Sequence, residues 1–135
     1  MAILDASVYL ALINNHESEH AASWRWFRQA QNNREIISAP VILLAETAAT
    51  LSRGMGNTAL AHRVVTQLSE SPLINLVPVT ADLAKRAASI AADYQIRGCD
   101  AVYVALAAQL DDYLMTLDKQ QLDRGANIIT TRQPK

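Results

Sequence analysis

The chain has 135 residues, of which 50% are hydrophobic and 19% are charged. This length and composition are typical of one globular domain spanning residues 1–135, and they exclude an intrinsically disordered chain. The net charge of -1 gives no overall attraction to polyanions, and the single cysteine excludes an internal disulfide and a multi-cysteine metal site.

The sequence also carries no sign of export or membrane insertion. The N-terminus lacks the basic region and the long apolar stretch of a signal peptide, and no apolar run approaches the ~18 residues that suggest a membrane span. A single cysteine suits a reducing compartment. We therefore expect a cytoplasmic protein with no membrane contact.

The first predicted elements are a strand and a helix joined by an acid. Residues 2–4 (AIL) form a short apolar run that ends at Asp5, and a helix-like segment, SVYLALI, follows at once. The asparagines at 14–15 break this helix. A buried strand that leads into a helix through an acidic turn opens many α/β folds.

A second helix is expected to begin near His16 and to carry Trp24 and Phe27 on its buried face. Trp26 points to another face, where it could pack against a partner, although burial or incidental exposure is the simpler interpretation. The first letters of this segment, HESEH, match the H-E-x-x-H pattern of zinc proteases. We predict no zinc site, because the G-x-x-H continuation is missing and the segment lies in a polar first helical turn, although the spacing alone leaves a downstream glutamate open as third ligand.

The middle of the chain continues the alternation of strands and helices. Residues 35–39 (EIISA) are predicted to be a strand, Pro40 to start a helix that runs to Gly54, and residues 58–68 to form another helix. A strand follows at residues 74–79 (INLVPV), and its proline indicates an edge strand or a strand end.

The last third of the chain adds three more helices and two strands. A helix is predicted from Thr80 to Gln95, a second opens at residues 98–100, and a strand ends at Asp118. KQQLDR then forms a short helix and NIIT, at residues 127–130, the last strand. About five strands alternating with helices predict a three-layer α/β/α fold with a central parallel sheet. Cys99, at a packed helix start, is expected to be a buried thiol and not a nucleophile.

Four acidic residues stand out because a solvated helix face does not explain them. Asp5 and Asp118 end predicted strands, Glu46 interrupts the apolar run VILLAETAA, and Asp100 opens an apolar helix. Groups at the C-terminal ends of parallel strands gather in the crevice where open α/β sheets bind ligands. A helix cap, an exposed side-chain end or a turn explains each acid alone, but explains the whole set less well.

Carboxylates gathered in a partly dry pocket repel one another, so we expect a cation to neutralise them. Hard oxygen ligands without sulfur or imidazole favour Mg²⁺ or Mn²⁺, which can activate water and bind a phosphodiester. The four acids therefore predict metal-assisted phosphodiester hydrolysis. Two other α/β classes fit less well. A haloacid-dehalogenase-type phosphatase needs D-x-D where this chain has D-A-S, and a receiver domain needs an acidic pair and a later lysine that are missing.

Four stretches carry the acids over nearly the whole chain: ILDASVYLALI, PVILLAETAATLSR, RGCDAVYVALA and LMTLDKQQL. In this order they resemble the PIN domains, and within them the VapC-type toxins of bacterial and archaeal toxin–antitoxin pairs. Ser7 takes the D-x-S position of the family and Thr116 its T-x-D position. We expect both to orient carboxylates or water, or to cap backbone groups, because neither has a histidine base in an obvious partner position.

The resemblance implies an α/β/α fold, Mg²⁺- or Mn²⁺-dependent cleavage of RNA, a homodimer, and a small antitoxin protein that blocks the site. Because the net charge is -1, RNA affinity has to come from local positive charge. The candidates near the motif ends are Arg53, Arg97, Lys119, Arg124 and Arg132, each of which is also explained as a solvated surface residue. The alternative function is a PIN-like domain with weak or no catalysis that acts as an RNA- or protein-binding module.

Overall fold

The computed structural model describes residues 1–135, and its centre is a parallel β-sheet. The strands are β1 (Ala2–Leu4), β2 (Ile37–Pro40), β3 (Asn75–Val77), β4 (Tyr113–Met115) and β5 (Thr131–Arg132). They lie in the order β3-β2-β1-β4-β5, and every neighbouring pair is parallel. The predicted fold class is confirmed.

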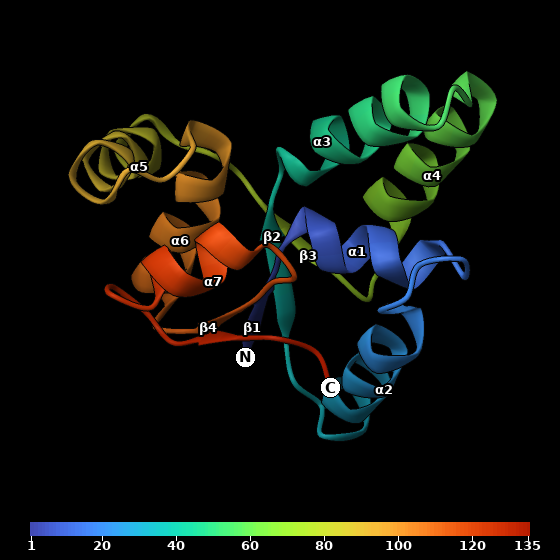
Figure 1. Ribbon diagram of the computed structural model, residues 1–135, viewed down its shortest axis with the longest axis horizontal. Coiled ribbons are helices and arrows are strands. Elements are labelled where there is room, and N and C mark those ends of the chain that lie inside the picture. Colours follow the sequence, from blue (N-terminus) through green and yellow to red (C-terminus); the bar gives the residue numbers. More distant parts are fainter.

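Helices cover the sheet from both sides, as Figure 1 shows. One group comprises α1 (Ala6–Ile13), α2 (His20–Asn32), α3 (Leu43–Ala49) with its π-helical continuation η1 (Thr50–Gly54), and α4 (Thr58–Glu70). The other comprises α5 (Ala81–Tyr94), α6 (Gly98–Leu110) and α7 (Lys119–Gly125). None of these helices combines the length and the apolar character needed to cross a membrane.

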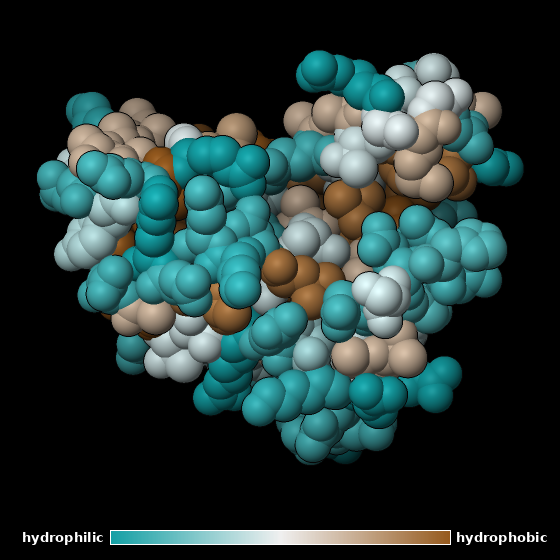
Figure 2. All heavy atoms as spheres, in the orientation of Figure 1, coloured by the Kyte–Doolittle hydropathy of each residue, from teal (hydrophilic) through white to brown (hydrophobic).

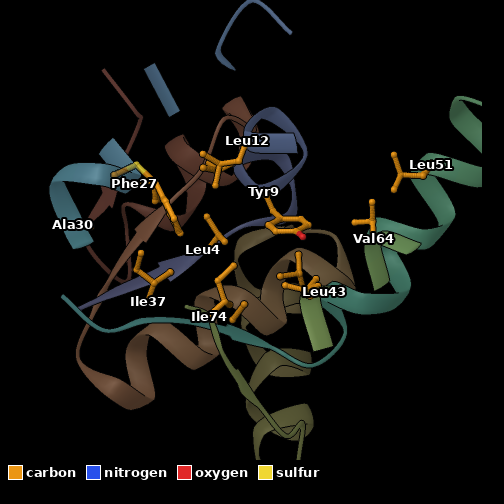
Figure 3. Packing of buried hydrophobic residues seen from close by; sticks show 14 of the residues in the cluster. Leu4, Tyr9, Leu12, Phe27, Ala30, Ile37, Leu43, Leu51, Val64 and Ile74 are labelled. Carbon is orange, nitrogen blue, oxygen red and sulfur yellow. The ribbon is translucent and has the colours of Figure 1, made fainter. Parts of the chain in front are cut away.

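The central strand β1 is buried on both faces, which explains its continuous apolar run. Leu4 packs into the core beneath α1 to α4, whereas Ile3 packs into the core beneath α5 and α6. Figure 3 shows Leu4 lying between Phe27 of α2 and Leu43 of α3. Consecutive side chains of one strand therefore tie the sheet to both helix layers.

The order of the strands reverses between β1 and β4. The chain runs outwards from β1 to β2 and β3, and then crosses to the other side of β1 for β4 and β5. Open parallel sheets bind ligands at such a switch point, beyond the C-terminal ends of the strands. Leu4 pairs with Met115, so the next residues, Asp5 and Thr116, leave the sheet side by side. In Figure 1, the C-terminal ends of β1 and β2 point towards the notch between α3 and α6. Figure 2 shows a hollow in the surface at this place.

Two predicted boundaries are wrong. Pro40 ends β2 and does not start a helix, because β1 pairs with β2 only as far as Ser38 and the missing N–H of proline costs no bond there. Residues 127–130 form a turn and a bend, since the N–H groups of Ile128 and Ile129 donate back to the Gly125 carbonyl at the end of α7. The last strand, β5, therefore begins at Thr131, after the predicted segment.

Other boundaries agree with the sequence. The proline-flanked strand is β3, which lies at an edge of the sheet. Thr80 caps α5, where its hydroxyl accepts the Leu83 N–H at 3.1 Å. The predicted helix that ends at Gly54 is present from Leu43, with its last turn widened into η1.

The segment around α2 departs most from prediction. HESEH is not the start of a helix, because residues 15–19 form turns and a bend and α2 begins at His20. Phe27 is buried as predicted, but Trp24 is 36% exposed. The Trp24 ring lies at the surface because its Nε1 donates to the Leu12 carbonyl at the end of α1, at 2.9 Å.

Two further side chains are placed differently from the simplest expectation. Cys99 is exposed and not buried, since in the first turn of α6 only the neighbouring Asp100 and Ala101 face inwards. Trp26 packs partly against the core on the α1 to α4 side, and its Nε1 donates to the Tyr113 hydroxyl at 3.2 Å.

Candidate active site

Asp5 is the buried centre of the acidic cluster. It follows β1, caps the N-terminus of α1 and is only 4% exposed. The Ser7 N–H (3.3 Å), the Ser7 hydroxyl and the Thr116 hydroxyl (2.9 Å) all donate to the same oxygen, Oδ2. Oδ1 has no hydrogen-bond partner in the protein. The two hydroxyl residues therefore fix the Asp5 carboxylate and leave one oxygen available.

Thr116 connects Asp5 to the beginning of α7. Its Oγ1 lies 2.9 Å from both Asp5 Oδ2 and Gln121 Oε1, and it accepts the Asp118 N–H at 3.0 Å. The hydroxyl has one proton, so it serves one of the two acceptors at a time, and an ionised Asp5 is the stronger acceptor. The buried Gln121 also donates to the Asp100 carbonyl at 3.1 Å. One glutamine thus links β4, α6 and α7.

Glu46 reaches the cluster from the first turn of α3. Its Oε1 accepts the hydroxyl of Tyr103 at 2.6 Å. Tyr103 lies on α6 and is fully buried, so its hydroxyl needs a polar partner. This bond joins the two sides of the notch and leaves Glu46 Oε2 without a hydrogen-bond partner.

Asp100 and Asp118 share one arginine. The Nε of Arg97 donates to Asp100 Oδ2 at 2.9 Å, and its Nη2 donates to Asp118 Oδ2 at 2.7 Å. Asp118 also caps α7, where its Oδ1 accepts the Gln121 N–H at 3.0 Å. Both oxygens of Asp118 are therefore used, whereas Asp100 keeps Oδ1 unpaired.

Burial and mutual repulsion disfavour the ionised form of three carboxylates in the cluster. Burial raises the pKa of Asp5, against the opposing effect of the hydrogen bonds from Ser7 and Thr116, and the charge of Asp100 raises it further. Burial also raises the pKa of Glu46 and of Asp100. Neighbouring carboxylates add to both shifts, and Arg97 is the one positive group that opposes them. A further cation would relieve this repulsion.

The donor set fits a hard divalent cation, but its positions do not form a complete ligand group. Asp5, Glu46 and Asp100 each present one carboxylate oxygen without a hydrogen bond, which is the chemistry that Mg²⁺ and Mn²⁺ prefer. However, no three His, Cys, Asp or Glu side chains are placed closely enough to hold an ion together. Arg97 holds Asp100 and Asp118 in their present positions.

The structure brings the six residues singled out in the sequence to one edge of the sheet: Asp5, Ser7, Glu46, Asp100, Thr116 and Asp118. Their roles as ligands remain a prediction. Sequence reasoning missed Tyr103 and Gln121. Each follows an acid of the set by three residues on a helix and therefore shares its face, and D-x-x-Q is also a capping-box pattern.

Of the five basic residues considered for RNA affinity, only Arg97 contacts the acids. Arg124 turns its Nη1 to the Gln95 carbonyl, and the Arg132 guanidinium lies 4.1 Å from the centroid of the Tyr113 ring. Arg53 lies in the last turn of η1. Lys119 directly follows Asp118 but forms no ion pair.

Comparison with known proteins identifies the family of this chain. A family model of the PIN domain matches residues 2–127. This chain belongs to the PIN domain family. The resemblance noted in the sequence is thereby confirmed at the level of the domain family, and no match was found among curated proteins.

Solved structures similar to this PIN domain are toxins and toxin–antitoxin complexes. VapC20 of Mycobacterium tuberculosis, described as a sarcin–ricin loop cleaving toxin, is 19% identical with a TM-score of 0.77, covering 98% of this chain and 99% of that chain. VapBC2 of Rickettsia felis, bound to a DNA fragment from its promoter, is 14% identical with a TM-score of 0.75, covering 99% and 98%. A toxin–antitoxin complex of Klebsiella pneumoniae is 16% identical with a TM-score of 0.68, covering 100% and 98%. At these identities the likeness shows the fold.

Proposed function

We propose that this PIN domain is an Mg²⁺- or Mn²⁺-dependent endoribonuclease and the toxin of a toxin–antitoxin pair. The observation that carries the proposal is the meeting of four carboxylates, from four separate segments of the chain, at the switch point of the sheet. Three of them keep an unpaired oxygen and have a raised pKa. Such a cluster is costly for folding alone, which favours a functional role.

In this proposal Asp5, Glu46 and Asp100 hold the ion, with Asp118 completing the acidic wall. The bound ion would lower the pKa of a water molecule and offset negative charge that develops on the phosphodiester. The protein's own contribution is to fix the carboxylates. Ser7 and Thr116 hold one oxygen of Asp5, and Tyr103 holds one oxygen of Glu46.

The biological setting rests on the structural relatives. VapC20 is described as a toxin that cleaves the sarcin–ricin loop, and the relatives from Rickettsia felis and Klebsiella pneumoniae are toxin–antitoxin assemblies. Their folds match this chain over nearly its whole length, which supports an RNA substrate and an antitoxin protein as partner. A homodimer in the cytoplasm is part of the same proposal, and light scattering on the purified chain measures the oligomeric state.

The direct test is cleavage of labelled RNA, single-stranded and hairpin, by the purified chain. We expect cleavage with Mg²⁺ or Mn²⁺, none with excess EDTA, and none by Asp100→Asn in either condition. Cleavage that persists in EDTA contradicts the role of the metal. A folded Asp100→Asn variant that cleaves at the wild-type rate contradicts the proposed site. If the wild-type protein cleaves no RNA but binds it or an antitoxin, the alternative of a binding module replaces this proposal.

A further inference from the structure

The protein contains two ion pairs between side chains, and Arg97 makes both of them. Of the 12 lysines and arginines, it alone lies within salt-bridge distance of any carboxylate, and it contacts two of the four acids of the site. The only other ion pair joins the N-terminal amine to Glu35. The only guanidinium that forms ion pairs with carboxylates therefore lies at the candidate active site.

The local structure holds the Arg97 backbone at the site but leaves its side chain accessible. Arg97 is the residue before α6, with φ -57° and ψ 144°, so its backbone has not yet entered the helix. Its side chain is 68% exposed, whereas the side chains of Asp100 and Asp118 are 12% and 24% exposed. An exposed cation thus lies over partly buried anions, and its departure would not disturb the core.

A guanidinium and a divalent cation compete for these carboxylates. Both are attracted by the same negative charge, and a cation bound to Asp100 would weaken the attraction between its carboxylate and the Arg97 guanidinium. A guanidinium released in this way has the fork of donors that matches phosphate oxygens. Arg97 is also the only basic side chain in contact with the four acids, which would otherwise repel a substrate phosphate.

We propose that Arg97 exchanges partners: it neutralises Asp100 and Asp118 in the metal-free protein, and a divalent cation releases it to bind the phosphodiester of the RNA. This inference rests on the proposed function. It assigns Arg97 two effects of opposite sign: the side chain weakens metal binding and strengthens RNA binding. If Arg97 were purely structural, its substitution would lower the affinity for both the metal and the RNA.

The test compares Mn²⁺ affinity, measured by calorimetry, with the KM and kcat for RNA cleavage. For Arg97→Gln we expect Mn²⁺ to bind about three- to tenfold more tightly, because the competing cation is gone, and KM for RNA to rise about tenfold or more. Arg97→Lys should restore part of the KM, since lysine keeps the charge but not the fork. Arg25→Gln, which removes an exposed arginine on α2, is the control for net charge.

The failures can be told apart. Unchanged or weaker Mn²⁺ binding by a folded Arg97→Gln variant, with cleavage by the wild-type protein intact, overturns this inference alone. An unchanged KM in that variant does the same. If the wild-type protein cleaves no RNA with saturating Mn²⁺, the proposed function and this inference fall together.

Discussion

The two ends of α1 both carry residues that proteins use to bind metals, yet they differ in chemical balance. At the N-terminal end, Asp5 is buried among further acids. At the C-terminal end, the carbonyl of Ala11 pairs with His20 Nδ1 at 2.7 Å, and the carbonyl of Leu12 accepts Trp24 Nε1 at 2.9 Å. His20 and Trp24 thus satisfy backbone carbonyls at the end of α1 that have no partner within the helix.

The difference teaches how to separate a functional polar cluster from a structural one. At the HESEH end, the ring nitrogen of His20 that faces the protein has a partner, and His16 is exposed to solvent. At the acidic end, carboxylates outnumber cations, and burial together with mutual repulsion raises the pKa of Asp5, Glu46 and Asp100. An added cation would stabilise a cluster that the fold leaves unbalanced, which supports the proposed metal site.

Of the substitutions at the two ends of α1, Asp5→Asn is expected to have the largest effect. The amide keeps an acceptor for Ser7 and Thr116 but removes the charge, so the fold should survive while the rate of RNA cleavage falls about 10³-fold or more, in line with several kcal/mol of charge stabilisation by a bound metal. Cleavage assays and thermal melting measure the two effects. Glu17→Gln, from HESEH, is the matched control, and a similar loss of cleavage in that variant would remove the contrast.

A smaller effect is expected in the pH dependence of stability without metal. Because folding raises the pKa of Asp5, Glu46 and Asp100, the folded protein binds more protons than the unfolded chain at mildly acidic pH. The contribution of these carboxyl groups to the free energy of unfolding therefore decreases as the pH rises through their raised pKa values. Each unit of pKa difference corresponds to about 1.4 kcal/mol.

Urea unfolding in EDTA at a series of pH values from acidic to mildly alkaline measures that fall. We expect Asp5→Asn to gain stability relative to the wild-type protein as the pH rises, because the variant no longer buries a charge. A difference between the two proteins that stays constant with pH would show that Asp5 titrates normally.

The smallest effect is expected at the other end of α1. His20→Ala removes the donor to the Ala11 carbonyl, which should lower the free energy of unfolding by about 0.5–1.5 kcal/mol, the usual net contribution of one hydrogen bond. RNA cleavage and Mn²⁺ affinity should stay at wild-type values once the protein is folded. Loss of metal binding in this variant would mean that HESEH takes part in the site.

The sequence allowed the fold and the acids to be predicted because both depend on local patterns. An apolar run such as AIL, followed by Asp5 and a helix, predicts a strand end at a ligand-binding edge, and parallel topology then brings Asp118 to the same edge. Pro78 predicted an edge strand or a strand end, and β3 is both, since it lies at an edge of the sheet and ends at Val77.

Features that depend on three-dimensional neighbours could not be read in this way. The exposure of Cys99 depends on which face of α6 packs against the core, and the exposure of Trp24 depends on where α1 ends. The bond between Tyr103 and Glu46 spans 57 positions of the chain, and no local pattern indicates it. The bridge made by Arg97 likewise joins Asp100 to an acid 21 positions away from Arg97.

Calorimetric titration of the purified chain with Mn²⁺ tests the central claim most directly. We expect the wild-type protein and the double variant His16→Ala/His20→Ala to bind Mn²⁺ equally well, and Asp5→Asn and Asp100→Asn to lose binding. Mn²⁺ binding that survives both aspartate substitutions, or that disappears with the two histidines, would contradict the assignment of the metal to the acidic edge of the sheet.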